Sequence, residues 1–159
     1  MTSTTKPKKP LSLELLTAKV LKLEFESIKP PSDEPTQIET RIQLAYNYKP
    51  EDKLIFAFIG IAISGEEAPF QVNLEYEGQF EINRKATKKE VEPIAKVNCN
   101  AILFPYVREI IADITRRGGY VPLHLASMNF SAMMEESRST KSPRRKGGNR
   151  RLVIRNGGN

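Results

Sequence analysis

Three consecutive segments in the middle of the chain have the apolar patterns of β-strands, and they constrain the fold more than any other feature. Residues 38–48 alternate apolar and polar side chains, and residues 70–82 do the same. Such alternation is typical of a strand with one buried face. Between them, residues 54–63 form a continuous apolar run, which predicts a strand buried on both faces or paired across an interface.

A fourth strand is predicted at residues 11–27, which are rich in leucine. The parity of the apolar positions changes twice along this segment. A single helix is the alternative, but the strict alternation of residues 21–25 favours a long strand with β-bulges where the phase slips. The proline-rich connector at 29–35 excludes regular structure. Short turns follow the second and third strands. The four segments together predict an antiparallel meander.

The pattern becomes helical after residue 86. Thr87 and Glu90 have the spacing of a capping box, which predicts a short helix that ends near Val97. A longer helix follows, because one apolar stripe recurs at helical spacing before the Gly118-Gly119 stop. This stripe consists of Leu103, Val107, Ile110, Ile111 and Ile114.

Asn129 is predicted to cap a last helix that carries Phe130, Met133 and Met134. The fold class is therefore α+β, with four antiparallel strands followed by helices. We predict a disordered basic arm at 1–10, one domain at 11–136 and a disordered basic tail at 137–159.

The positive charge belongs to the ends of the chain. Residues 137–159 carry eight Lys or Arg and no acid, and the first ten residues carry three Lys. The domain therefore has 25 − 11 = 14 basic residues against all 19 acidic ones. No apolar run approaches the ~20 residues of a membrane span, and no secretory signal is recognised, so we expect a cytoplasmic protein that is not membrane-embedded.

Residues suited to catalysis are sparse. His124 is the only histidine and Cys99 the only cysteine, and neither has a metal-ligating neighbour in the sequence. The glycine pairs lack the strand–glycine–helix context of a phosphate loop. The sequence predicts a binding protein with no cofactor and no metal, and not an enzyme.

Several motifs occur in an order that is typical of one protein family. Asn100-Ala-Ile-Leu-Phe-Pro-Tyr-Val-Arg-Glu109 contains the start of the helical stripe, Arg117-Gly118 follows its end, and Leu123-His-Leu-Ala-Ser-Met-Asn-Phe130 comes next. Upstream, Ile63-Ser-Gly-Glu-Glu67 and Gly78-Gln-Phe80 are similar to the ends of that family's third and fourth strands. The chain resembles the SecB family over about residues 13–135.

The resemblance implies a twisted four-stranded antiparallel sheet with helices packed on one side. It also implies a tetramer, built as a dimer of dimers, that holds unfolded client polypeptides in long apolar grooves without ATP. The candidates for lining such a groove are Phe25, Tyr46, Tyr48, Phe56, Phe58, Phe104, Tyr106, Met128, Phe130 and Met133. The stripe Leu103, Val107, Ile110, Ile111 and Ile114 is the candidate for contacts between subunits.

The resemblance also implies a sheet face that docks the SecA motor through acidic residues. Glu24 and Glu26 match this pattern, whereas Lys22 and Asn73 stand where such family members tend to carry acids. Delivery to SecA is therefore one hypothesis, and service as a dedicated chaperone of an antitoxin is a second. A third is a nucleic-acid- or ribosome-associated role, with weak phosphate contacts through the basic tail.

Overall fold

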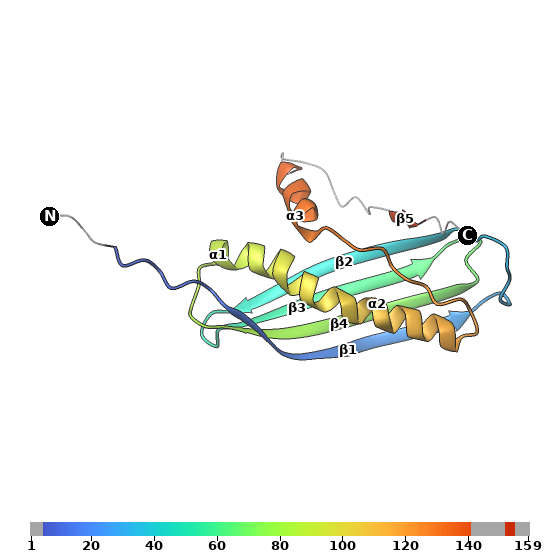
Figure 1. Cartoon of the computed structure of the whole chain (residues 1–159), viewed down its shortest axis with the longest axis horizontal. Helices are drawn as coiled ribbons and strands as arrows, with labels where there is room; N and C mark the ends of the chain where they lie inside the picture. Colours follow the sequence, from blue (N-terminus) through green and yellow to red (C-terminus); the bar gives the residue numbers. More distant parts are fainter. Residues whose placement is uncertain (1–4, 141–151, 155–159) are drawn as a thin grey trace.

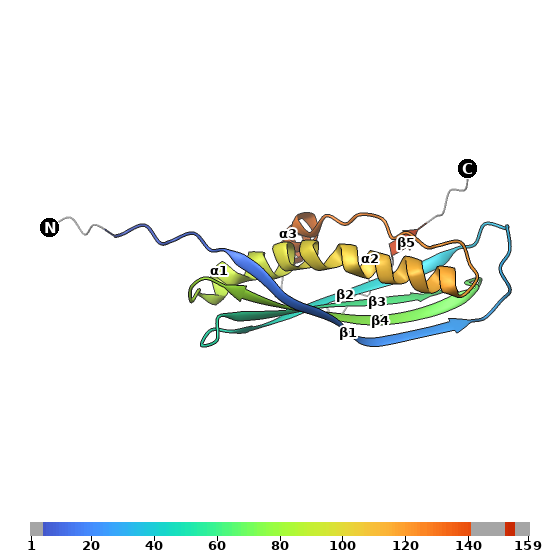
Figure 2. The ribbon, with the colours of Figure 1, turned by 60° about the horizontal axis from the view of Figure 1, so that its bottom comes forward.

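A single antiparallel sheet carries a layer of helices on one side (Figures 1 and 2). The computed structural model describes residues 5–140 and 152–154. Four long strands form the body of the sheet, which twists along its length (Figure 2). They are β1 (Leu13–Ser27), β2 (Ile38–Lys49), β3 (Leu54–Ser64) and β4 (Phe70–Ile82). The predicted fold class is confirmed.

The strand order is β1-β4-β3-β2-β5, where β5 is Leu152–Ile154. Strands β2, β3 and β4 form the predicted meander, but β1 pairs with β4 and not with β2, so the prediction of a four-strand meander was wrong. The connector at 28–37 is long enough to carry the chain from β1 to the far edge. The four strands thus form a Greek key.

The predicted bulges in β1 are present. The register against β4 shifts between Leu15 and Thr17 and again between Val20 and Lys22. The extra residues are Leu16 and Leu21, both close to half exposed. Each bulge returns the following residues to the face that their apolar or polar character requires.

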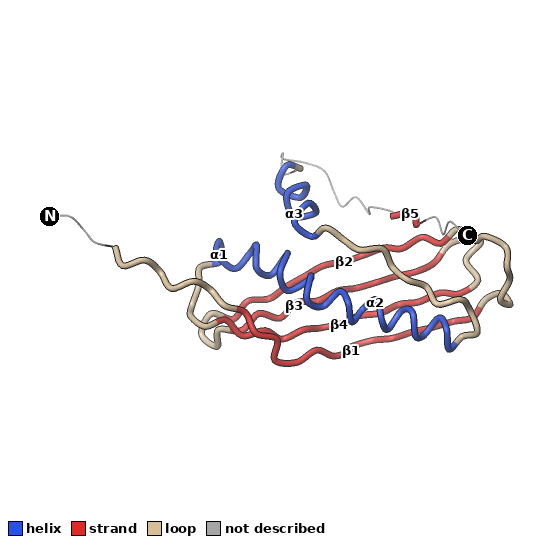
Figure 3. Tube along the Cα trace, in the orientation of Figure 1, coloured by secondary structure: helices blue, strands red, loops and turns tan. Residues whose placement is uncertain are grey.

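The core lies between the sheet and α2 (Asn100–Arg117), which runs along one face (Figure 3). Alternate residues of β3 point into it, from Ile55 to Ile63, and each is at most 2% exposed. The helix contributes Leu103, Val107 and Ile111, all fully buried. The stripe read from the sequence is therefore the face that packs on the chain's own sheet.

The helical segment before α2 is continuous with it. Helix α1 (Lys88–Pro93) begins at the predicted capping box and leads into a π-helical turn, η1 (Ile94–Cys99). The side chain of Asn100 donates to the carbonyl of Lys96 at 2.8 Å. This bond uses the carbonyl that a regular α-helix would pair with the backbone N–H of Asn100.

Helix α3 (Phe130–Ser139) begins where the sequence predicts, with the Asn129 side chain accepting from the N–H of Ala132 at 3.0 Å. It extends three residues into the segment predicted to be a disordered tail. Residues 152–154 form β5. The remainder of that tail, and residues 1–4 of the arm, lie outside the described residues.

Candidate functional site

A hollow of about 410 Å³ opens between the helices on the helix side of the molecule. Its lining comes from two segments that are distant in sequence: the junction of η1 with α2, and residues 127–131, which lead into α3. The residues are Val97, Ala101, Met128 and Phe130, with Ser127, Asn129 and Ser131 at the polar part of the wall. Phe130 packs edge-on against Phe104, with ring centroids 5.6 Å apart. The hollow is shaped by a stable aromatic pair and by the half-buried Met128.

Two predicted groove residues, Tyr46 and Tyr48, lie on the helix-side face of β2. Both are half-buried and pack against the core. The hydroxyl of Tyr48 also holds the segment before α1 in place: it donates to the carbonyl of Ala86 at 2.9 Å and accepts from the N–H of Ala86 at 3.0 Å. These tyrosines mark β2 as a partly open apolar strand.

Phe25 lies with a different aromatic cluster. Its ring is 6.0 Å from that of Phe70 and 6.3 Å from that of Tyr120. Phe25 also fills the space next to Gly118, where a β-carbon would clash with its ring. Tyr120 also links the end of α2 to the start of β4, since its hydroxyl donates a hydrogen bond to the carbonyl of Pro69 at 3.0 Å. Phe25 therefore joins β1 to the end of α2, and Met128 and Phe130 are not part of this cluster.

Phe56 and Phe58 lie on the opposite, open face of the sheet. Their neighbours Ile55 and Ala57 point into the helix-side core and are fully buried, so the alternation of β3 directs Phe56 and Phe58 the other way. Phe56 lies beneath the ammonium of Lys49, 5.0 Å from its ring centroid. The ten groove candidates are thus divided between two faces, and a single groove does not contain them all.

Tyr106 is the most exposed of the groove candidates, with 43% of its surface accessible. Its ring is 6.3 Å from that of Tyr76 in β4. Burial raises the pKa of Tyr76, with smaller contributions from Tyr106 and Glu109. Tyr106 is on the flank of α2, next to the strands β4 and β1, and lies apart from the residues lining the hollow at α3.

The subunit-interface candidates need a correction. Leu103, Val107 and Ile111 are fully buried in the core of this chain, so they offer no surface to a second subunit. Ile110 and Ile114 are only half-buried, on the flank of the helix. The apolar stripe of α2 is wide, so its central residues pack on the chain's own sheet while its flank remains partly accessible to a second subunit.

The docking-face candidates come together on the open face. Lys22 is opposite Glu75, and Glu24 is opposite Asn73 in the register of β1 with β4. Asn73 donates to Glu24 at 3.4 Å, and Lys22 forms an ion pair with Glu24 at 3.6 Å. Glu26 follows two residues later on the same face. The sequence-based grouping of these four residues thus corresponds to one surface.

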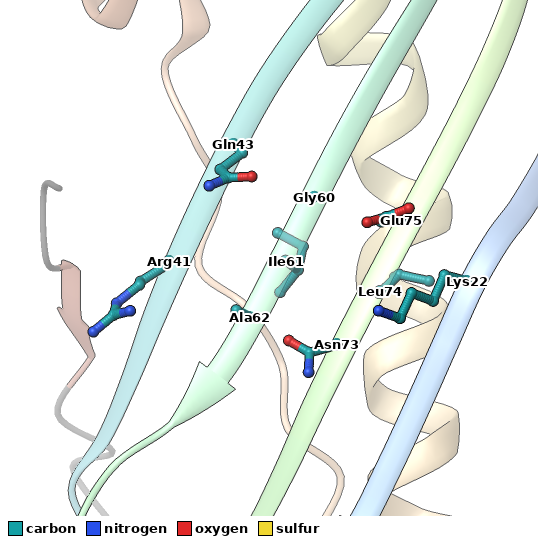
Figure 4. Close-up of a pocket in the computed structure, with 9 residues that line it drawn as sticks. All are labelled: Lys22, Arg41, Gln43, Gly60, Ile61, Ala62, Asn73, Leu74 and Glu75. Atoms are coloured by element: carbon teal, nitrogen blue, oxygen red, sulfur yellow. The ribbon is translucent and has the colours of Figure 1, made fainter. Parts of the chain in front are cut away.

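A shallow hollow of about 300 Å³ lies on this open face, next to Lys22 (Figure 4). The side chain of Lys22 reaches from β1 over β4, between Asn73 and Glu75 (Figure 4). The side chain of Arg41, on β2, points away from β3 and β4 (Figure 4). The floor is Gly60 and Ala62 of β3. Lys22 therefore places a positive charge inside a patch whose nearest charged neighbours are carboxylates.

Two features of this side of the molecule have no signal in the sequence pattern. Val97 and Ala101 line the hollow because the π-helical turn sets their direction. Val20 and Leu23 of β1 are 43% and 39% exposed although they lie on the apolar side. Cys99 is buried, and this burial raises its pKa to about 12, so the thiol is unreactive at neutral pH.

A family model described as preprotein translocase subunit SecB matches residues 6–141. The chain belongs to the SecB family. A protein-export protein SecB from Xanthobacter autotrophicus is 30% identical over 133 residues, which cover 79% of this chain and 84% of that protein. The SecB of Acidithiobacillus ferrooxidans is 36% identical over 78 residues, covering 49% of this chain and 52% of the relative. The match therefore spans about half the length of that relative.

The fold is also similar to that of a solved structure. The SecB-like chaperone of Mycobacterium tuberculosis, solved with a ChAD peptide from an antitoxin, has a TM-score of 0.64 at 18% identity. The likeness covers 73% of this chain and 90% of that one. Within the described part of the chain, no helix has the length and apolarity needed to cross a membrane, and no three His, Cys, Asp or Glu side chains are grouped as metal ligands.

Proposed function

We propose that this SecB-family chain is an ATP-independent holdase that binds unfolded polypeptides and keeps them competent for export. The observation that carries the proposal is the hollow at Met128 and Phe130, which lies on the same side as the half-buried tyrosines of β2. An unfolded client exposes apolar side chains, and burying them in such a hollow is favourable. Flexible methionine and aromatic surfaces adapt to clients of different sequence.

In this proposal the protein acts only by binding its client. It is a chaperone of the cytoplasm and not an enzyme. Relatives named as protein-export proteins support this role. Binding without nucleotide requires that client release be driven by a partner with higher affinity or by the client's own folding. The apolar hollow has no charged residue in its lining, which suits an apolar client segment.

We propose that it assembles as a homotetramer, a dimer of dimers. Support comes from an apolar surface that the single chain leaves uncovered along β1 and the flank of α2. Its members are Val20, Leu21, Leu23, Ile102 and Tyr106, each between 38% and 47% exposed. Half-buried Ile110 and Ile114 lie on the same helix. A second copy would bury these side chains.

A second observation supports a partner surface on α2. The Nε atom of Arg108 is buried and has no hydrogen-bond partner among the residues that the structure describes. Buried polar groups are ordinarily hydrogen-bonded. Arg108 lines a hollow of about 510 Å³ between α2 and the 122–124 segment, together with Glu109 and Asp113. An acceptor supplied by another subunit would satisfy Arg108.

Delivery of the client to SecA is part of the proposed export role, but we propose that the contact is weak. Lys22 pairs with Glu24 and faces Glu75, which reduces the negative field of the open face. A basic docking module would meet like charge at Lys22. Glu26 and Glu24 remain as the acidic part of the surface.

A second candidate function, as a dedicated chaperone of an antitoxin, is favoured by a specific comparison. The SecB-like chaperone of similar fold was solved with a peptide from an antitoxin. This alternative uses the same apolar site and removes the need for SecA. A nucleic-acid- or ribosome-associated role depends on the basic tail, most of which lies outside the described residues.

Light scattering tests the proposed function. The wild-type protein, without nucleotide, should suppress aggregation of a reduced, unfolded client at near-stoichiometric amounts. Met128→Lys should weaken client affinity by about tenfold, because a charge replaces an apolar side chain in the hollow. Met134→Lys is the matched control, since Met134 lies six residues further along the chain, on α3, and does not line the hollow. An absolute requirement for ATP, or equal loss in both variants, would contradict the proposal.

A further inference from the structure

The outer edge of β2 is largely open. Its inner edge pairs with β3 along the whole strand, from Glu39 to Lys49. On the outer side, only residues 38–40 pair, and their partner is β5. Residues 41–49 have no strand partner on that side within the part of the chain that the structure describes. An edge strand with free N–H and C=O groups is a template for a further strand.

The strand that occupies this edge comes from the chain's own basic tail. Ile154, Val153 and Leu152 are paired in antiparallel register with Ile38, Glu39 and Thr40. They are the only apolar residues between 137 and 159, and two of the three are β-branched. Arg151 and Arg155 flank them. This short segment thus has the composition of an extended peptide with high β propensity and positive ends.

The side chains of β2 become more exposed beyond the point where the pairing with β5 ends. On the helix-side face, Ile38 is 5% exposed and Thr40 is 1% exposed, next to β5. Further along the same face, Ile42, Leu44, Tyr46 and Tyr48 are only half-buried. The uncovered part of the edge therefore continues directly into an apolar row. A longer extended segment that replaced β5 would cover this row as well.

We propose that residues 152–154 are an intramolecular competitor that occupies the outer edge of β2 by strand addition, so that a client segment must displace them to pair there. In strand addition, main-chain hydrogen bonds supply affinity and alternate side chains supply selectivity. Three paired residues are a weak strand, but a competitor that is covalently part of the same chain acts at an effective concentration in the ~mM range. A client segment that is longer and more apolar displaces them. Only this last step rests on the proposed function.

Charge favours the same arrangement. The tail carries eight Lys or Arg, whereas residues 11–136 carry five more acids than bases, as 19 − 14. Attraction between the tail and the domain as a whole raises the local concentration of the competitor and weakens as salt increases. The charged side chains along the uncovered edge itself are Arg41 and Lys49, so the preferred occupant is defined by an apolar, β-branched centre and not by charged flanks.

A pair of double variants tests the competition. Successive N–H groups point to opposite sides of a strand, so Leu152→Pro with Val153→Pro removes at least one donor directed at β2. Asn156→Pro with Gly157→Pro is the matched control, with the same number of prolines outside β5 and no change in charge. Both are made in the full chain, which retains every residue of the hollow.

Hydrogen exchange and a probe peptide are measured on all three proteins. The amides of residues 38–40 should exchange about three- to tenfold faster in the β5 variant than in wild type and control. A fluorescent peptide with the sequence of residues 150–155 should bind the β5 variant at least about threefold more tightly. Unchanged exchange and equal peptide affinity would overturn the proposal.

Client affinity separates this inference from the proposed function. The β5 variant should hold a reduced, unfolded client at least about threefold more tightly than wild type at low salt. If the peptide binds the β5 variant more tightly but client affinity is unchanged, the tail covers the edge without competing and the proposal is overturned. If no variant holds any client, the proposed function fails, and exchange and peptide binding still decide whether β5 occupies the edge.

Discussion

Leu103 of α2 lies directly over Gly78 of β4: a β-carbon on residue 78 would be 2.5 Å from Leu103 Cδ2 and 2.8 Å from Phe80 Cε2. The helix approaches the sheet this closely because residue 78 has no side chain. This contact fixes the depth of α2, and with it the position of η1 and of the hollow next to α3. A substitution at Gly78 therefore tests whether this close contact between α2 and β4 stabilises the fold.

Gly78→Ala is expected to destabilise the fold by about 1–3 kcal/mol, because the added methyl group overpacks a fully buried contact. Gly60→Ala is the matched control in the neighbouring strand, where a β-carbon would be 3.5 Å from that of Gln43, an ordinary contact. Urea denaturation of both variants measures the difference. Equal stability of the two variants would contradict the packing described at Leu103.

Acid stability should depend on Glu90. Its carboxylate accepts from the N–H of Thr87 at 2.8 Å and from Arg84 at 3.2 Å, and these bonds lower its pKa to about 2 from 4.5. A carboxylate with a lowered pKa stabilises the fold above the unfolded value and stops doing so as pH falls to the folded value. This contribution is therefore present above about pH 4.5 and is lost toward pH 2.

Glu90→Gln tests this dependence. The stability advantage of the wild type over the variant should be constant from pH 7 to about 5 and should shrink between pH 4.5 and 2. Thr87→Ala should cost about 1 kcal/mol at neutral pH through loss of the helix cap, and Thr87→Ser should retain it. Thermal unfolding at stepped pH provides the measurement. A difference that is independent of pH would show that the Glu90 charge does not stabilise the cap.

Assembly should depend on the flank of α2 and not on its buried stripe. Ile110→Glu places a charge on the half-buried flank, where an unpaired charge within an interface would cost several kcal/mol. We expect the variant to dissociate to dimers or monomers in light scattering while its helical circular dichroism is retained. Gln71→Glu on the open face is the control and should remain a tetramer of about four times 18.0 kDa. A monodisperse wild-type monomer would contradict the proposed assembly.

Restoring acid on the open face should strengthen docking to SecA. Lys22→Asp with Asn73→Glu removes the cation next to Glu24 and adds two carboxylates to the β1–β4 surface. Calorimetry against the basic C-terminal module of SecA should show at least about tenfold tighter binding than wild type, at unchanged client affinity. Tight binding by the wild type that the double variant does not improve would mean that the module docks elsewhere.

Much of this fold follows from the sequence, because periodicity reports which residues share a face. The alternation in β2 and β4, the phase slips at Leu16 and Leu21, and the capping residues Thr87 and Asn129 predicted the elements correctly. Periodicity does not report what covers a face. The stripe containing Leu103 is equally suited to a sheet and to a second subunit, and only the structure shows that the sheet buries it.

The order of the strands in the sheet could not be predicted from the sequence pattern either. Nothing in the alternation of β1 distinguishes an edge position next to β4 from one next to β2, since both offer the same alternating partner. Phe56 and Phe58 were grouped with the tyrosines of β2 by residue type, although the parity of β3 sends them to the open face. The hollow depends on the π-helical turn, which has no periodic signature of its own.

The central claim is that extended polypeptide binds on the helix side, at the hollow and along β2. Hydrogen exchange of the full protein with and without a reduced, unfolded client tests it most directly. The account predicts slower exchange at residues 41–49 and 127–133 on client binding, with little change on the open face around Lys22 and Asn73. Protection confined to that open face, with residues 41–49 and 127–133 unaffected, would contradict it.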